Sequence, residues 1–299
     1  SKNFGDSAFS VTAPTEANSV GGTFTYSSGT TSVISVSGST LTVAGVGTSV
    51  ITATFTPTNT TNYNTATTTM TVTVGKGSPT FSAWSNVSKN FGDSAFTVTA
   101  PTVTGSLGGT FAYSSGTPSV ISVSGTTLTV VGAGSSVITA TFTPNDTTNY
   151  NTATTTMTVT VGKATPTFSS WSNVSKNFGD SAFTVTAPSV TGSVAGSFTY
   201  SSATTSVISV SGTTLTVVGV GTSVITATFT PTDSTNYNSA TTTMTVTVSK
   251  AVLSITASSH TVAYGAAIPT ITPTYSGFVN GDTSSVVTAP ICSTTYTTT

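Results

Sequence analysis

The chain has 299 residues, with six basic and seven acidic side chains and a formal net charge of −1. Charged residues make up 4% of it, against about 25% in an ordinary soluble domain. This sparse charge excludes a basic surface for nucleic acid and a polybasic patch for an anionic membrane, because both need clustered Lys or Arg.

The apolar content favours a folded chain over a disordered one. Val, Ile and Phe alternate regularly with Ser and Thr, and hydrophobic residues make up 36% of the sequence. The single cysteine, Cys292, excludes a disulfide within the chain. No apolar run reaches the length of about 18 residues that a membrane-spanning helix needs, so membrane insertion is not expected. A start at Ser1 rather than Met is typical of a fragment or a processed product.

An internal repeat organises most of the sequence. The string SKNFGDSAF begins at Ser1, Ser88 and Ser175, a spacing of 87 residues. Lysines, loop tyrosines, methionines and tryptophans recur at the same spacing: Lys2, Lys89 and Lys176; Lys76, Lys163 and Lys250; Tyr63, Tyr150 and Tyr237; Met70, Met157 and Met244; Trp84 and Trp171. This period is too long for a solenoid coil and suits an independent sandwich domain of about 100 residues.

Links that contain lysine predict the domain boundaries. These links are Val-Gly-Lys at 74–76 and 161–163 and Val-Ser-Lys at 248–250. The expected domains are an immunoglobulin-like repeat without its first strand at 1–75, complete repeats at 76–162 and 163–249, and a divergent, truncated β domain at 250–299. Because both ends fall inside predicted domains, we expect the segment to be part of a longer protein.

The repeat at 76–162 shows the strand pattern in chain order. Apolar residues alternate with Ser or Thr, and Gly or Pro stands between the runs. The expected strands are an opening strand over 79–87, then segments at 96–100, 111–113, 120–123, 128–131, 138–144 and 157–161. About seven short strands without helical period predict an all-β fold, namely tandem immunoglobulin-like β-sandwich domains in an elongated rod.

Glycine and proline mark the ends of these strands. Gly125 stands between two of them and can supply the positive φ of a tight hairpin turn, so a hairpin is expected over 120–131. Pro101 and Pro144 lack the amide proton that a strand ladder needs, and each is expected to end strand pairing.

Two kinds of aromatic residue are assigned structural roles. Tyr150 follows a long polar loop, where a tyrosine hydroxyl can bond back to the backbone as in a tyrosine corner. Tyr63 and Tyr237 occupy the same position in the other repeats. Trp84 and Trp171 lie in the expected opening strand, where burial or a place at a domain junction is favoured over an exposed platform for a glycan or a protein.

The stretch SVISVSGTTLTVVGAGSSVITATF at 119–142 resembles bacterial immunoglobulin-like domains of group 2, which occur in invasin- and intimin-type surface proteins. The block recurs at 32–55 and 206–229, and the loop TPNDTTNYN at 143–151 is similar to an insertion in repeats of large bacterial adhesins. The resemblance implies an immunoglobulin-like fold and rods on cell surfaces. Similar domains also decorate phage tails and heads, so a virion component stays open.

The C-terminal stretch AYGAAIPTITPTYSGFVNGDTSSVV resembles the MBG-type repeats that accompany such domains in giant secreted adhesins. In that family a cysteine near the position of Cys292 often has a partner further along the chain. The resemblance therefore leaves open a disulfide beyond this segment.

The sequence offers little for catalysis. Its only histidine is His260 in the tail, so a Ser-His-Asp arrangement cannot form within the repeats. Carboxylates are isolated, whereas acid–base catalysis needs two groups with pKa values tuned apart. Zinc and iron sites lack Cys and His ligands. We therefore expect no catalytic residues, no cofactor and no enzymatic activity.

Asp6, Asp93 and Asp180 are weak candidates for binding calcium. Ca²⁺ takes about six to eight oxygen ligands, usually with several carboxylates. Each of these residues follows Phe-Gly in a turn, where Asp more often caps the turn through its own backbone. A structural Ca²⁺ at a domain junction is thus the minor alternative.

These observations predict a non-catalytic extracellular or cell-surface segment that acts as a stiff spacer, a stalk or fibre presenting a distal element. Two alternatives stay open, a phage fibre or capsid or tail decoration protein, and an array of carbohydrate-binding modules. The partner is an unknown surface, glycan or protein. Low charge and edge strands also permit self-association into a fibre.

Overall fold

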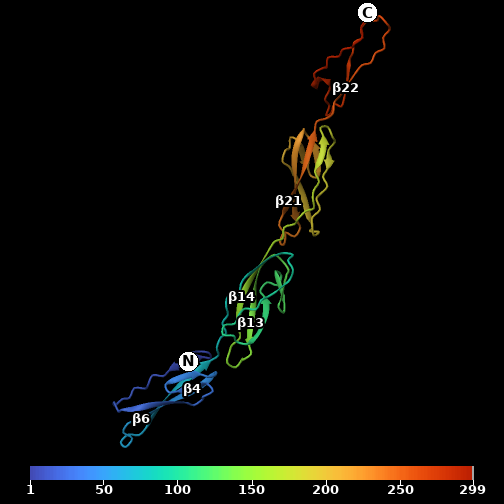
Figure 1. Ribbon diagram of the computed structural model, residues 1–299. Helices are drawn as coiled ribbons and strands as arrows, with labels where there is room; N and C mark the ends of the chain where they lie inside the picture. The colour runs from blue at the N-terminus through green and yellow to red at the C-terminus, as the bar shows by residue number, and fades with distance from the viewer. Residues whose placement is uncertain (298–299) are drawn as a thin grey trace. The chain divides into compact units, whose positions relative to one another are not determined.

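The alternation of apolar residues with Ser and Thr produces seven strands in each repeat (Figure 1). The computed structural model describes residues 1–297, and their strands and connecting loops are accompanied by one 3-10 turn, η1 at Ser284–Val286. The described part of the chain holds no helix long and apolar enough to span a membrane. The expected all-β, immunoglobulin-like fold class is confirmed.

The chain divides into two compact units, Ser1–Gly162 and Lys163–Thr299. The first unit contains the first two repeats, and the second contains the third repeat and the tail. The break between the units falls at the expected link 161–163. The finer division into four domains stays a prediction.

The second repeat consists of a four-stranded and a three-stranded sheet. The four-stranded sheet has the order β10 (Gly109–Ser115), β13 (Gly134–Pro144), β14 (Ala153–Gly162) and β8 (Val87–Asn90). The three-stranded sheet has the order β11 (Ile121–Ser124), β12 (Thr127–Val130) and β9 (Phe96–Thr97). Two sheets of this kind each turn one apolar face inward, which is the packing of a β-sandwich.

The other two repeats have the same strand order. The first contains β1 (Lys2–Asn3), β2 (Phe9–Ser10), β3 (Gly22–Ser28), β4 (Ile34–Ser37), β5 (Thr40–Val43), β6 (Gly47–Pro57) and β7 (Ala66–Gly75). The third contains β15 (Val174–Asn177), β16 (Phe183–Thr184), β17 (Gly196–Ser202), β18 (Ile208–Ser211), β19 (Thr214–Val217), β20 (Gly221–Pro231) and β21 (Ala240–Ser249). The strand order is the same because apolar residues and glycines occupy the same positions in the sequence of each repeat.

The strand registers explain why the alternating pattern gives a core. In the antiparallel β13–β14 ladder, Ile138 lies opposite Met157, and β8 pairs with β14 in parallel, so that Val87 lies opposite Val159. Ile138, Met157 and Val159 point inward while the residues next to them point outward, because successive side chains alternate between the faces of a strand.

Buried side chains from both sheets form one hydrophobic cluster in each repeat. In the second repeat Ile121, Leu128, Ile138 and Val159 are 0% exposed, and Met157 is 3% exposed. The cluster of the third repeat contains the equivalent residues, whereas the cluster of the first repeat lacks the methionine. Ile138 and Met157 thus lie in the core of the second repeat, whereas Val137 in the same strand is 47% exposed and Met70 in the first repeat is 41% exposed.

The expected hairpin over 120–131 is also confirmed. β11 and β12 pair with Ser124 opposite Thr127, and Gly125 in the turn has a φ of +59°. A side chain is strained in this left-handed region, whereas glycine adopts it freely.

The expected opening strand over 79–87 is wrong in most of its length. Only Val87 belongs to a strand, β8, and the preceding segment is held by the isolated bridge between Phe81 and Val103. The Ser82 amide donates to the carbonyl of Thr102, whereas Val87 already pairs with β14. Because the segment changes partners between these points, no continuous ladder can form along it.

The expected strand at 96–100 is shorter than the alternation suggests. β9 ends at Thr97, and the Val98 amide then donates to the carbonyl of Thr126. This bond continues the contact with the hairpin for one more residue. The chain leaves the sheet before Pro101, which has no amide proton to offer to a ladder.

One serine in each repeat lies inside the sandwich: Ser49, Ser136 and Ser223. The Ser136 hydroxyl lies 2.8 Å from the Ser115 hydroxyl and accepts the Thr117 amide at 3.1 Å. Burial of the hydroxyl is tolerated because its hydrogen-bonding capacity is used within the protein.

The tail pairs β22 (Ser254–Ala257) with β23 (Pro273–Ser276) in antiparallel fashion. The Tyr296 hydroxyl donates to the carbonyl of Ala266 at 3.1 Å and so holds the final described residues against the turn at 263–266. Cys292 is a free thiol.

We predict that Ile138→Ala destabilises the second repeat by about 2–5 kcal/mol, because it removes a fully buried side chain and leaves a cavity. The only tryptophans are Trp84 and Trp171, one in each of the second and third repeats. In a Trp171→Phe background, the fluorescence of Trp84 therefore reports urea unfolding of the second repeat alone.

Val137→Ala is the matched control, because Val137 is adjacent in β13 but 47% exposed. Its expected effect is within about 0.5 kcal/mol. Equal effects of the two substitutions would contradict the assignment of inward and outward faces.

Candidate functional site: the tryptophan groove and the inter-repeat loop

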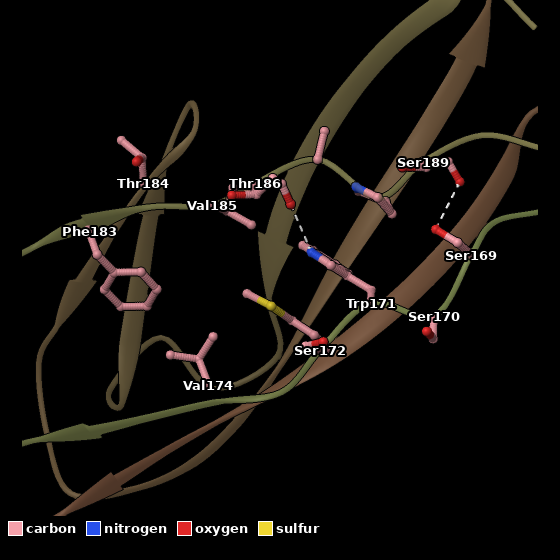
Figure 2. A pocket seen from close by; sticks show the side chains of 13 residues that line it. Ser169, Ser170, Trp171, Ser172, Val174, Phe183, Thr184, Val185, Thr186 and Ser189 are labelled. Carbon is pink, nitrogen blue, oxygen red and sulfur yellow. Dashed lines mark hydrogen bonds between the residues drawn. The ribbon is translucent and has the colours of Figure 1, made fainter. Parts of the chain in front are cut away.

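The second and third repeats each carry a groove beside a tryptophan, here called the tryptophan groove. In the third repeat it lies between segments 169–174 and 183–189, with Met244 also lining it, and has a volume of about 350 Å³ (Figure 2). The second repeat has the equivalent groove between 82–87 and 96–102, of about 330 Å³. Recurrence of the groove follows from recurrence of the sequence.

Each tryptophan is fixed by packing and by one hydrogen bond. The indole N–H of Trp171 donates to the carbonyl of Thr186 at 2.9 Å (Figure 2). The Trp171 ring lies 5.9 Å from that of Tyr200. Trp84 donates to Thr99 at 2.8 Å in the same way. Both rings are half-buried and pack against the core cluster of their own repeat. This position agrees with the expectation that the two tryptophans are buried rather than exposed as binding platforms. The structural role of the tryptophans stays a prediction.

Burial beside the groove also shifts the pKa of one tyrosine in the second repeat and of one in the third. Desolvation raises the pKa of Tyr113 and of Tyr200 above the ordinary value of 10.0. Both hydroxyls are therefore neutral at physiological pH.

In each repeat a lysine side chain from one sheet lies over a phenylalanine ring of the other sheet. Lys89 Nζ in β8 lies 4.8 Å from the centroid of the Phe96 ring in β9. Lys2 and Lys176 make the same contact with Phe9 and Phe183, at 4.7 Å in both cases. A cation over an aromatic face contributes about 0.5–1 kcal/mol at an exposed site. The contact joins the two sheets, and sequence reasoning missed it although the recurrence of these lysines was a usable signal.

The lining of the groove limits its chemistry. In the third repeat it carries the hydroxyls of Ser169, Ser170, Ser172, Thr184 and Thr186 beside apolar side chains, and no ionisable side chain is among the lining residues. Ser169 donates both its amide and its hydroxyl to the carbonyl of Ser189, at 3.0 and 3.5 Å. The groove therefore suits neutral apolar or hydroxyl-bearing groups and offers no acid, base or nucleophile with a shifted pKa.

A second recurring feature is the loop between the last two strands of each repeat. In the second repeat this loop, residues 145–152, joins β13 to β14 and is here called the inter-repeat loop. The Asp146 carboxylate accepts the backbone and side-chain amides of Asn149 at 3.0 and 2.8 Å. Lys76 donates to the carbonyl of Thr147 at 2.7 Å and ties the loop to the link before the repeat.

The inter-repeat loop contacts the first repeat within the first compact unit. Asn149 Oδ1 accepts the backbone amide of Val46 at 3.1 Å. The Tyr150 ring meets the Phe4 ring edge to face, with centroids 5.2 Å apart and an interplanar angle of 88°. A Cβ on Gly77 would lie 2.5 Å from the Phe4 carbonyl oxygen, so only glycine allows this approach.

The tyrosines at this position were expected to bond the loop backbone through their hydroxyls. The structure places the Tyr150 ring against Phe4. The Gly77 amide donates to the Asn149 carbonyl, and the Asn151 amide donates to the Gly77 carbonyl. Tyr63 in the first repeat is 51% exposed. The hydroxyl bond of a tyrosine corner stays a prediction, and the contact between repeats was not foreseen.

The three aspartates proposed as weak calcium ligands lie in the expected turns. Asp6, Asp93 and Asp180 each accept the backbone amide of the asparagine three residues earlier, at 2.9, 2.8 and 2.9 Å. The residues that the structure describes contain no group of three or more His, Cys, Asp or Glu side chains placed to hold a metal. A Ca²⁺ role stays a prediction.

Comparison with known proteins adds a family for the tail. A family model described as MBG domain (YGX type) matches residues 253–299, which confirms the resemblance of the tail to MBG-type repeats. No curated protein sequence matches the chain. The assignment of the repeats to the bacterial group 2 immunoglobulin-like family stays a prediction.

Several solved structures of tandem extracellular domains match the chain at low identity and low TM-score. Drosophila N-cadherin EC1-4 is 11% identical, with a TM-score of 0.30, and the match covers 76% of this chain and 66% of that one. Drosophila OTK extracellular domains 3-5 are 10% identical, with a TM-score of 0.31 and coverage of 81% and 91%. Sidekick-1 immunoglobulin domains 1-5 are 11% identical, with a TM-score of 0.28 and coverage of 84% and 58%.

We predict that acid loosens the inter-repeat loop. Hydrogen bonds from the Asn149 side chain and backbone lower the pKa of Asp146 below its ordinary value of 3.8. A carboxylate with a lowered folded-state pKa stabilises the fold above its unfolded pKa, and this contribution is lost as pH falls through the folded pKa. The Asn149 and Val46 amide resonances should therefore shift together below about pH 4.

Asp146→Asn is the control for this titration. It removes the carboxylate, so the two amide resonances should lose their common acid transition while the second repeat stays folded. An unchanged transition in the variant would show that another group is responsible.

Proposed function

We propose that this chain is a non-catalytic extracellular structural or adhesive segment whose repeats form a stiff spacer. The spacer would hold a distal element away from a cell surface, or from a virion in the alternative of a phage fibre or decoration protein. Its partner would be a surface, a glycan or a protein at the distal end. The contact between the first two repeats is the observation that carries this proposal.

The use of charge supports a structural role. Every charged side chain between residues 1 and 249 makes a contact within the chain. Lysines lie over phenylalanines or donate to carbonyls, aspartates accept amides within turns and loops, and Glu16 accepts the Val20 amide. Charges used in this way fasten strands and loops, whereas catalytic groups face a substrate.

The short link supports stiffness between the first two repeats. Gly75 ends β7, and Gly77 is already bonded to Asn149 and Asn151 of the inter-repeat loop. Almost no free chain therefore lies between the repeats. With Asn149 bonded to Val46 and Tyr150 packed on Phe4, bending at this link would break a hydrogen bond and an aromatic contact.

The tryptophan groove favours glycan binding as a second candidate function. A half-buried tryptophan beside several hydroxyls suits a sugar, which presents apolar C–H faces and hydroxyls together. Screening the full chain and a Trp84→Ala/Trp171→Ala variant on a glycan array tests it. Glycan retention by the unaltered chain but not by the variant would support this function. Absence of retention by the unaltered chain, or equal retention by the variant, would contradict it.

We predict that Asn149→Ala/Tyr150→Ala loosens the link between the first two repeats. The variant removes the hydrogen bond to Val46 and the ring contact with Phe4, so the two repeats should sample a wider range of orientations. Spin labels on cysteines at the exposed positions Thr40 and Thr127, with Cys292→Ser, measure this as a distance distribution by pulsed electron paramagnetic resonance.

The matched control is Asn62→Ala/Tyr63→Ala, which makes the same change in the equivalent loop of the first repeat, away from this link. A narrow distribution in the unaltered chain and the control, with a broad one in the variant, is the expected result. A broad distribution in the unaltered chain would refute the stiff spacer.

A further inference from the structure

The repeated string SKNFGDSAF contains a turn with a fixed shape, here called the Phe-Gly turn. It spans residues 3–6 in the first repeat and 177–180 in the third. In the third repeat the Asp180 amide donates to the Asn177 carbonyl at 3.0 Å, and the Asp180 carboxylate accepts the Asn177 amide at 2.9 Å. The first repeat has the same two bonds, and the glycines of the two turns have φ values of +94° and +96°.

Parallel strand pairing places the Phe-Gly turn where the chain leaves the repeat. β15 pairs with β21 in parallel, so that Asn177 lies opposite Ser249, the last residue of β21. The Phe178 amide then donates to the Ser249 carbonyl at 2.8 Å. Because parallel strands run in the same direction, the end of the first strand and the end of the last strand lie at the same end of the sandwich. The turn is therefore within reach of the domain that follows.

In the first repeat the Phe-Gly turn contacts the second repeat. The Tyr150 ring meets the Phe4 ring edge to face, with centroids 5.2 Å apart. The backbone at Gly77 passes so close to the Phe4 carbonyl that a Cβ on Gly77 would lie 2.5 Å from the oxygen. One aromatic side chain of a loop in the following domain thus packs on the turn.

In the third repeat the Phe-Gly turn contacts the tail, within the second compact unit. A Cβ on Gly179 would overlap the side chain of Val279, whereas a Cβ on Gly5 or on Gly92 would meet nothing within 4 Å. Gly179 is half-buried, whereas Gly5 and Gly92 are exposed. Because the three turns have the same sequence, the difference comes from the tail residue that covers Gly179.

The tail presents Val279 from a tight turn of its own. The Asp282 amide donates to the Val279 carbonyl at 3.0 Å, and the two residues between them, Asn280 and Gly281, have φ values of +58° and +83°. Two consecutive residues with positive φ are typical of a type I′ turn, for which Asn-Gly is the favoured sequence. Two closed turns therefore meet in this contact.

We propose that the Phe-Gly turn of the third repeat is the docking surface for the tail, and that it accepts one bulky apolar side chain from a loop of the following domain. Val279 fills this place on the third repeat, as Tyr150 does on the first. Asp180 is a positioning residue, because its carboxylate closes the turn. The inference rests on the stiff spacer proposed above and extends it to a link between two different kinds of domain.

The test measures the orientation of the tail relative to the third repeat in the full chain. Spin labels on cysteines at the exposed positions Thr214 and Thr256, with Cys292→Ser, give a distance distribution by pulsed electron paramagnetic resonance. The unaltered contact should give a narrow distribution. Gly179→Ala should broaden and shift it, because the added methyl group displaces Val279.

Gly5→Ala is the matched control for this substitution. It imposes the same left-handed strain on an alanine, at a φ of +94° against +96°, but its Cβ meets open space. It should leave the distribution between Thr214 and Thr256 unchanged. Any effect of Gly179→Ala beyond this control therefore comes from the contact with Val279.

A second pair of variants leaves the sequence of the third repeat unaltered. Val279→Asp brings a charge into the half-buried contact and should broaden the distribution, because a carboxylate loses water there without gaining a partner. Val286→Asp, at a residue of the tail that is 60% exposed, is the control and should leave the distribution narrow.

Two results would overturn the inference. One is a broad distribution between Thr214 and Thr256 in the chain without the Gly179 or Val279 substitutions. The other is an equal effect of Gly179→Ala and Gly5→Ala. Labels at Thr40 and Thr127 separate this failure from that of the stiff spacer: a narrow distribution there would leave the spacer standing between the first two repeats, whereas a broad one would refute both.

Discussion

The hairpin formed by the last two long strands of each repeat is the element on which the rest of the structure depends. In the second repeat, the β13–β14 ladder sets Ile138 opposite Met157 and so fixes the core. Met157 also lines the tryptophan groove, and the loop that joins the two strands holds Asn149 and Tyr150 against the first repeat. A shift of one strand by one residue in this ladder would turn its core side chains to the opposite face and would displace the loop that the two strands hold. The core, the groove and the link between repeats therefore depend on one register.

A chain with so few charges uses them inside its own fold. Lys89 reaches from one sheet over Phe96 of the other, and Asp146 orients Asn149, which then accepts an amide from the first repeat. Hydration of the outer surface is left to the Ser and Thr side chains that alternate with the core residues. A change at one of these lysines or aspartates would therefore remove a contact within a repeat or at the link.

The segment before the parallel strand covers one face of the four-stranded sheet in the second and third repeats. In the second repeat it changes partners between Phe81 and Val87, and its two aromatic rings cover the apolar face of the four-stranded sheet. Phe81 and Trp84 therefore fasten this segment to the core of its own repeat.

The sequence by itself determined the all-β class, the period of 87 residues, the alternation of inward and outward side chains along the strands, and the turn at Gly125, because each depends on neighbours along the chain. It could not give the route of residues 79–86, since alternation there reads as a strand while the partners change midway. Nor could it give the bond between Asn149 and Val46, whose residues lie 103 positions apart. Periodicity specifies which way a side chain faces within its own strand. Only the packed tertiary structure decides which distant side chain or backbone group it then meets.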